Sequence, residues 1–338
     1  MTAQQKRTIF WALAAVVVVC FLALSIVSQV GDIQDFDWHF SPGWLAISMV
    51  LLILFQGMHA YLWTRLVRVT GGTLPAGPGI RIFSIGLLTR YVPTQILMAI
   101  TRVTMLAARG VPRSISAASL AYEFPLAVGS AFALSVAFLI DLPELKHHDA
   151  RWLVLLAPVA LLSLLHPRIV DTLESKLSAR LNVESEHLTV PIARLVPFVA
   201  AYVLSFTVAG LGVYAFARSI YADANLDLRV LTSYAIGYSA AVLAFFIPGG
   251  LGARDGATAT ALAAVMPNKV AIAVAIGIRL AQTLVELGYA GVAELLHRRR
   301  GGGSAARDAG DADDLVAPGG RGQVEREKAA EGRDRKLG

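Results

Sequence analysis

The stretch FFIPGGLGARDGA, residues 245–257, interrupts the apolar sequence on either side of it and decides how the chain folds. It places Pro248, four glycines and the pair Arg254 and Asp255 between two apolar runs. Proline removes a backbone donor and glycine weakens a helix, so peptide groups are freed where a bilayer has no water to satisfy them. Such a break persists only where protein or a polar cavity surrounds it, which makes it a candidate binding site.

The composition indicates a membrane protein. Of the 338 residues, 56% are hydrophobic and only 16% are charged, whereas soluble domains average about 25% charged residues. We therefore expect an all-α, polytopic bundle of membrane helices. The net charge of +6 could suggest a nucleic-acid partner. The basic residues cluster in short loops between apolar runs, however, as membrane topology requires, so we expect no nucleic acid.

Several kinds of site have no sequence support. Cys20 is the single cysteine, which excludes an intrachain disulfide and any metal site built from several cysteines. The sequence contains no P-loop, HExxH or GxSxG motif and no Cys-His metal spacing. We expect neither a metal nor a cofactor.

Apolar runs of about 20 residues are long enough to cross a bilayer. Lys6 and Arg7 precede the first run, so the positive-inside tendency places the N-terminus in the cytoplasm. Residues 168–194 are polar and are interpreted as an amphipathic cytoplasmic linker. The expected spans are residues 9–30, 44–63, 114–140, 195–217, 230–247 and 270–296, with a shorter one at residues 152–166.

Two segments are interrupted. Residues 82–107 are apolar but contain Arg90, Pro93 and Arg102, and basic residues flank both ends. This pattern predicts a hairpin of two short helices that turns near residues 91–94. Residues 250–266 either dip into the membrane or cross it, and the charge rule favours a crossing, which brings the total to about eight crossings.

The two interruptions resemble each other. YVPTQI at residues 91–96 and FIPGGL at residues 246–251 share the order aromatic, β-branched, proline, two small or polar residues, aliphatic. Paired interruptions are typical of transporters built from repeats. A match this short also arises by chance in apolar sequence, so both explanations stay open.

The charged end of the chain differs from the rest. Residues 299–338 contain many Asp, Glu, Arg and Lys and almost no large apolar side chains, so they cannot bury a core. We expect a multi-pass membrane domain over residues 1–298 and a disordered cytoplasmic tail over residues 299–338.

Ionisable residues inside apolar runs cost about 2.5–3.5 kcal/mol each, so they tend to be paired or functional. In this chain they are Arg90, Arg102, Glu123, Arg254, Asp255, Arg279 and Glu286. The glycines that precede Arg254 are Gly249, Gly250 and Gly252. Arg254 is therefore expected at a helix N-terminus, where the helix dipole favours an anion and arginine can bind phosphate through two parallel hydrogen bonds. Alternatively, Arg254 faces the cytosol and Asp255 caps the helix.

The remaining ionisable residues have competing structural explanations. Arg279 and Glu286 are seven residues apart and share a helix face, which is either part of a binding site or a polar seam between helices. Glu123 has Arg102 or Arg279 as its simplest partner, and pairing for insertion alone would explain it. His59 is interpreted as an interfacial side chain.

Three patterns in the sequence resemble those of a known protein family. IPGGLGARDG at residues 247–256 is similar to the Pro-Gly-Gly-x-Gly-x-Arg-Glu/Asp-Gly signature of the flippase-like family that includes the transmembrane region of lysylphosphatidylglycerol synthase. Arg102, the basic loop after it and the helix that carries Glu123 match a second family pattern. Arg279 in the last span is the third match. The glycine and acid that usually precede the first arginine are absent from YVPTQILMAITR.

The resemblance implies a lipid-translocating protein of the plasma membrane with both termini in the cytoplasm. An anionic phospholipid or polyprenyl-phosphate-linked headgroup would cross between broken helices. The aminoacyl-transferring domain of lysylphosphatidylglycerol synthase is absent, so lysyl transfer is not expected. The resemblance implies that phosphate is bound by Arg102, Arg254, Arg279, Gly249, Gly250 and Gly252, with charge balanced by Glu123, Asp255 and Glu286.

Two other functions stay open. A membrane-embedded transferase acting on a lipid-linked sugar would need a general base, for which Asp255 and Glu123 are the plausible residues. An accessory subunit of a cell-envelope complex would need no chemistry of its own. A membrane lipid or a lipid-linked sugar is the expected partner in the first two cases, and envelope-synthesis proteins in the third.

Overall fold

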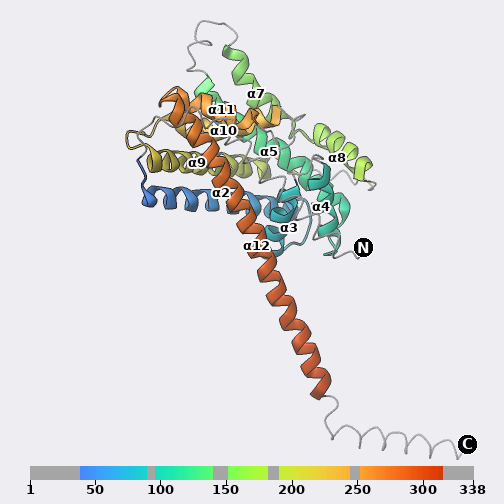
Figure 1. Ribbon diagram of the computed structural model, residues 1–338. Coiled ribbons are helices and arrows are strands. Elements are labelled where there is room, and N and C mark those ends of the chain that lie inside the picture. The colour runs from blue at the N-terminus through green and yellow to red at the C-terminus, as the bar shows by residue number, and fades with distance from the viewer. Residues whose placement is uncertain (1–38, 90–95, 140–150, 182–189, 244–251, 315–338) are drawn as a thin grey trace, which may run out of the picture. The chain divides into compact units, whose positions relative to one another are not determined.

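The computed structural model describes residues 39–89, 96–139, 151–181, 190–243 and 252–314 (Figure 1). Within these ranges every element is an α-helix, which confirms the all-α prediction. The chain divides into two units, Met1–Ala290 and Gly291–Gly338, and the contacts discussed below lie in the first. The helices are α2 (Pro42–Val69), α3 (Ala76–Leu88), α4 (Ile96–Ala107), α5 (Arg113–Leu139), α7 (Arg151–Ser163), α8 (Pro167–Leu181), α9 (Ile192–Ile220), α10 (Leu228–Leu243), α11 (Ala253–Ala263) and α12 (Asn268–Asp314).

Four helices in the described part of the chain are long and apolar enough to cross a membrane. They are α2, α9, residues Arg113–Val136 of α5 and residues Asn268–Arg299 of α12. Each has at least 24 residues, which at about 1.5 Å per residue exceeds a hydrocarbon core of about 30 Å. These helices confirm four of the predicted spans and the polytopic fold class. The predicted span over residues 9–30 lies outside the described residues.

Two pairs of short helices separate the long ones. α3 and α4, of 13 and 12 residues, pack against each other, as the hairpin prediction for residues 82–107 requires. α10 and α11, of 16 and 11 residues, form a second packed pair. The expected crossing over residues 250–266 is therefore not a full span in its described part, because α11 rises only about 16 Å. Both connecting segments, residues 90–95 and 244–251, lie outside the described residues.

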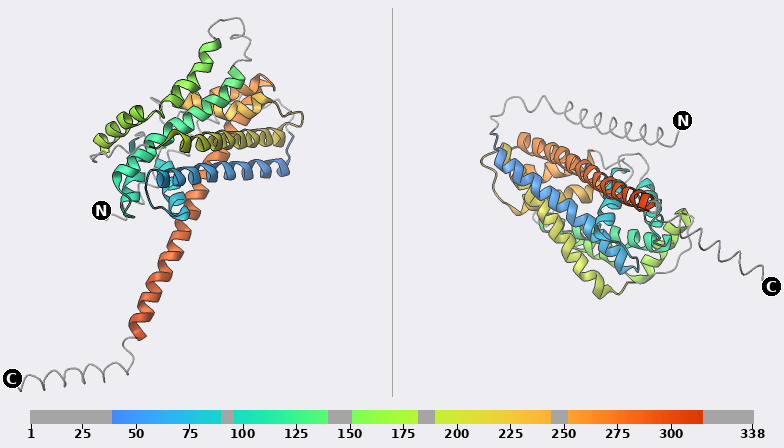
Figure 2. Two further views of the ribbon diagram at one scale, coloured as in Figure 1. Left: turned by 180° about the vertical axis from the view of Figure 1, so that it is seen from behind. Right: turned by 90° about the horizontal axis from the view of Figure 1, so that it is seen from below.

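The helix lengths repeat along the chain. A long helix, two short packed helices and a long helix occur as α2 to α5 and again as α9 to α12, with α7 and α8 between the two series. The first helices of the series, α2 and α9, run side by side (Figures 1 and 2). α7 falls on the predicted short span and α8 on the first half of the predicted linker. α12 stays helical to Asp314, and the division of the chain at residue 298 remains a prediction.

Small residues allow the central helices to approach closely. Ser48 of α2 donates a hydrogen bond to the carbonyl oxygen of Gly212 on α9, at 2.8 Å. On the opposite side of α9, Gly210 lies so close to α10 that a Cβ there would be 1.9 Å from the Leu231 carbonyl oxygen. Close approach at small residues is the usual basis of helix packing in membranes. The core around this contact combines side chains of α2, α9, α10 and α12.

Candidate functional site

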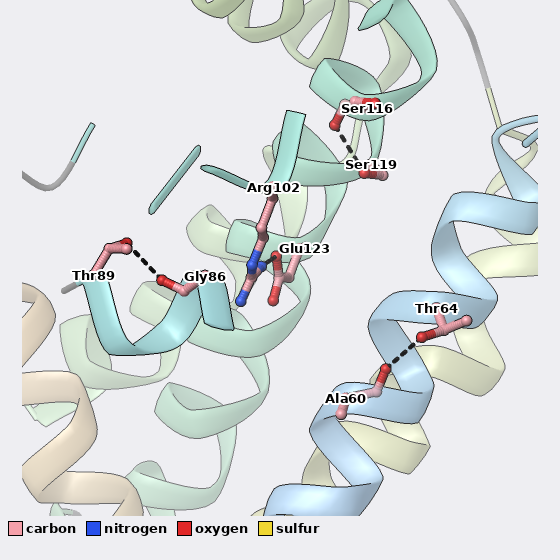
Figure 3. Close-up of polar contacts among 8 residues, drawn as sticks. All are labelled: Ala60, Thr64, Gly86, Thr89, Arg102, Ser116, Ser119 and Glu123. Atoms are coloured by element: carbon pink, nitrogen blue, oxygen red, sulfur yellow. Dashed lines mark hydrogen bonds and ion pairs between the residues drawn. The ribbon is translucent and has the colours of Figure 1, made fainter. Parts of the chain in front are cut away.

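Arg102 is fixed at the centre of the first hairpin and is only 1% exposed. Its Nη1 donates a hydrogen bond to Oε2 of Glu123 on α5 at 2.6 Å (Figure 3). Its guanidinium carbon lies 4.3 Å from the ring centroid of Phe83 on α3 and 5.0 Å from that of Trp63 on α2. A Cβ at Gly86 of α3 would lie 2.6 Å from the Arg102 Cγ, so only glycine leaves room for this side chain.

The structure decides which arginine pairs with Glu123. Glu123 had two possible partners, and the structure pairs it with Arg102. The side chain of Glu123 is 16% exposed, so the pair is largely shielded from solvent and the two charges compensate each other where neither could be solvated. Nε of Arg102 is buried and has no hydrogen-bond acceptor among the described residues. The pair therefore leaves part of the guanidinium available to a further acceptor.

Arg254 is the second residue of α11, at the helix N-terminus that the sequence predicted. Gly252, directly before the helix, has a φ of +79°, which glycine adopts without strain. Arg254 is 7% exposed, and its guanidinium carbon lies 4.7 Å from the ring centroid of Tyr234 on α10. Burial against α10 argues against the alternative in which Arg254 faces the cytosol. Asp255 lies in the first turn and is partly buried, and Gly249 and Gly250 lie outside the described residues.

Arg279 and Glu286 are buried on α12, with exposures of 5% and 2%. Gln282 lies between them and donates hydrogen bonds from Nε2 to Oε1 of Gln56 on α2, at 3.1 Å, and to Oε1 of Glu286, at 3.2 Å. The stripe therefore faces into the protein and joins α12 to α2 as a polar seam. The seam interpretation of the sequence has direct support, and a binding role for Arg279 remains a prediction.

His59 packs against α9, a contact that the sequence did not predict. Its Nε2 lies 2.9 Å from Oγ of Ser205 on α9, and its ring centroid lies 4.4 Å from that of Phe55 and 5.1 Å from that of Tyr202. His59 thus lies between α2 and α9, and its position at a membrane interface stays a prediction. The four-residue spacing of Phe55, His59 and Trp63 on α2 could have indicated this, because it puts all three on one helix face.

A comparison with models of known protein families shows which family the chain matches. The model of the lysylphosphatidylglycerol synthase TM region matches residues 9–288, a range that contains both hairpins and every predicted site residue. The chain belongs to this family. No curated protein and no solved structure matches the chain. The match confirms the resemblance seen in the sequence and identifies an integral membrane protein linked to lipid or cell-envelope biosynthesis or transport.

The polar seam of this family member yields a first prediction. Replacing Gln282 with leucine removes both of its donated hydrogen bonds and leaves buried oxygens of Gln56 and Glu286 without that donor. We expect a loss of about 1 kcal/mol of folding free energy, the usual size of an interhelical hydrogen bond in a membrane. Thermal unfolding in detergent measures the loss. The Gln56→Leu/Gln282→Leu variant should lose less than the sum of the two single variants, and strict additivity would contradict the seam.

Proposed function

We propose that this chain translocates the headgroup of an anionic phospholipid or a polyprenyl-phosphate-linked sugar across the plasma membrane, with both of its termini in the cytoplasm. The observation that carries the proposal is the burial of Arg102, Arg254 and Arg279 inside an apolar helix bundle, at 1%, 7% and 5% exposure. Cations at this depth are costly and are retained where they bind or transport charge. Membership of the family supports the same assignment.

The chemistry of the arginine sites suits a phosphate. A guanidinium offers up to five N–H donors in a plane and binds phosphate oxygens through two parallel hydrogen bonds. Aromatic faces next to Arg102 and Arg254 hold each guanidinium by cation–π contact, which fixes its direction without occupying its N–H groups. Glu123, Asp255 and Glu286 would balance the positive charge when no headgroup is bound.

Proteoliposomes test the proposal. The full chain is reconstituted with fluorescent phosphatidylglycerol, and movement of the label between leaflets is followed by its quenching from outside. Arg254→Ala should lower the translocation rate about tenfold or more, because a lost contact of about 1.4 kcal/mol already gives a factor of ten. Arg65, exposed on α2, provides the matched control. Arg65→Ala should change the rate by less than about twofold.

The same preparation discriminates between the alternatives. Unchanged translocation by a monodisperse Arg254→Ala variant would contradict the proposal. Turnover of a labelled lipid-linked sugar by the purified chain would replace it with a transferase, in which Asp255 or Glu123 would serve as base. A protein that co-purifies stably with the chain, together with arginine variants that have no effect on translocation, would favour an accessory role in envelope synthesis over the proposed function.

A further inference from the structure

A four-residue motif occurs once in each hairpin. α3 contains Phe83-Ser-Ile-Gly86, and α10 contains Tyr234-Ala-Ile-Gly237. Both motifs read aromatic, small, isoleucine, glycine. Because the aromatic residue and the glycine are three positions apart, they lie on the same face of their helix.

Each motif places its aromatic ring against an arginine guanidinium. The guanidinium carbon of Arg102 lies 4.3 Å from the ring of Phe83, and that of Arg254 lies 4.7 Å from the ring of Tyr234. A Cβ at Gly86 would lie 2.6 Å from Cγ of Arg102. A Cβ at Gly237 would lie 2.1 Å from Oγ1 of Thr258, 2.9 Å from the carbonyl oxygen of Arg254 and 3.4 Å from its Cγ. In each hairpin the arginine therefore comes from the second short helix, which packs closely against the glycine of the first. We call these the Arg102 site (Phe83, Gly86, Arg102) and the Arg254 site (Tyr234, Gly237, Arg254).

One face of α2 connects the two sites. Trp63 contacts the guanidinium of Arg102 at 5.0 Å, and Phe55 contacts the ring of Tyr234 at 5.1 Å. His59 lies between Phe55 and Trp63, four residues from each. We call these three residues the α2 row. Eight residues separate its ends, which corresponds to about 12 Å along the helix.

Unsatisfied donors lie along this row. Among the buried groups without a hydrogen-bond partner in the part of the chain that the structure describes, four lie on or beside this row: Nε2 of Gln56, Nε1 of Trp63, Nε of Arg102 and Oη of Tyr202. Gln56 adjoins Phe55 on α2, and Tyr202 contacts the ring of His59. All four groups can donate, and three of them, Gln56 Nε2, Trp63 Nε1 and Arg102 Nε, can only donate. Leaving a buried donor unsatisfied costs about 1–3 kcal/mol, so the groups fit a ligand rich in acceptors, as a phosphate is.

We propose that the chain has two phosphate sites of the same construction, the Arg102 site and the Arg254 site, and that a lipid headgroup moves between them along the α2 row past His59. This inference rests on the proposed function and specifies its route. The α2 row, whose ends lie about 12 Å apart along the helix, would divide a path through about 30 Å of hydrocarbon into shorter steps. His59 offers a polar ring midway, where it already contacts Ser205. The row is largely buried, so passage requires α2 and α9 to separate on this face.

Lipid counting tests the two sites. The delipidated full chain is titrated with dioctanoyl phosphatidylglycerol and examined by native mass spectrometry. We expect two bound lipids on the wild-type chain, one on Gly86→Ala, one on Arg254→Ala and none on the double variant. Gly86→Ala is suitable because the three atoms nearest to the added Cβ all belong to the flexible Arg102 side chain. A single lipid on the wild-type chain, or loss of all lipid in either single variant, would overturn the inference.

The route is tested separately with His59. His59→Leu should keep both lipids but slow translocation about tenfold, and His59→Gln, which keeps a polar group, should stay within about threefold of wild type. A His59→Leu variant that translocates at the wild-type rate would refute the route. Displacement of both lipids by millimolar inorganic phosphate would show that free phosphate, not a lipid, is the ligand. Two bound lipids without translocation would overturn the proposed function and leave the two sites standing. Translocation with a single bound lipid would support the proposed function and overturn the two-site inference.

Discussion

Replacing Glu123 with leucine should lower the folding free energy by about 3–5 kcal/mol, the usual cost of removing one partner of a buried ion pair. The Arg102 side chain is only 1% exposed, and its Nη1 lies 2.6 Å from the Glu123 carboxylate. The change removes this acceptor and leaves the guanidinium charged in a buried position. Arginine cannot release its proton inside a protein, so the charge persists. The loss is measured as the change in free energy of unfolding of the purified protein in detergent or bicelles.

Two further variants test the reason for this loss. Arg102→Leu should cost less than Glu123→Leu, because a carboxyl group can take up a proton and become neutral, whereas a guanidinium cannot. Arg102→Leu/Glu123→Leu should recover most of the stability, since apolar residues often replace a buried ion pair without loss. If all three variants lost the same amount, the side chains would contribute through packing and not through charge.

The double variant also separates stability from function. It retains an apolar contact between α4 and α5 but has no cation next to Phe83 and Trp63. We therefore expect a folded protein that binds one lipid and translocates poorly. Wild-type translocation by this variant would remove Arg102 from the proposed mechanism while leaving the stability argument intact.

Much of the fold follows from the sequence because bilayer thickness restricts helix length. Runs of about 20 apolar residues correctly predicted α2, α5, α9 and the apolar part of α12. The hairpin of α3 and α4 was predictable because Arg90, Pro93 and Arg102 interrupt a run whose flanks are both basic. The second hairpin was harder to predict, since the run from residue 230 to 247 reads as a full span, and only its part within α10, up to Leu243, is described.

The site was only partly predictable because packing partners are not encoded in spacing. The sequence identified Arg102 and Glu123 but could not choose between Arg102 and Arg279 as the partner of Glu123. The contact of His59 with Ser205 was not predictable either, because the sequence does not show that α9 covers this face of α2.

The repeated motif was missed because the hairpins were aligned on their prolines. Gly86 precedes Pro93 by seven residues, whereas Gly237 precedes Pro248 by eleven. The difference, eleven minus seven, is four residues, or about one helical turn. An alignment on the prolines therefore places Gly86 and Gly237 four positions out of register, and the match between the two motifs is lost.

Gly210→Ala should destabilise the protein by about 3 kcal/mol, the upper range for overpacking. The added Cβ would lie 1.9 Å from the carbonyl oxygen of Leu231, a backbone atom that moves only if α9 and α10 separate. Tyr234 follows Leu231 by less than one turn of α10 and contacts Arg254, so the displacement reaches the Arg254 site. We expect translocation and binding of the second lipid to fall together with the unfolding temperature.

Gly212 on the same helix provides the matched control. A Cβ at Gly212 would lie 3.4 Å from Cδ2 of Leu52, an ordinary contact with a side chain. Both replacements carry the same gain in helix propensity, about 1 kcal/mol, so the difference between Gly210→Ala and Gly212→Ala isolates the clash with α10. Equal unfolding temperatures for the two variants would show that α9 and α10 can separate at little cost. In that case the position of Tyr234, and with it the Arg254 site, would not depend on this helix contact.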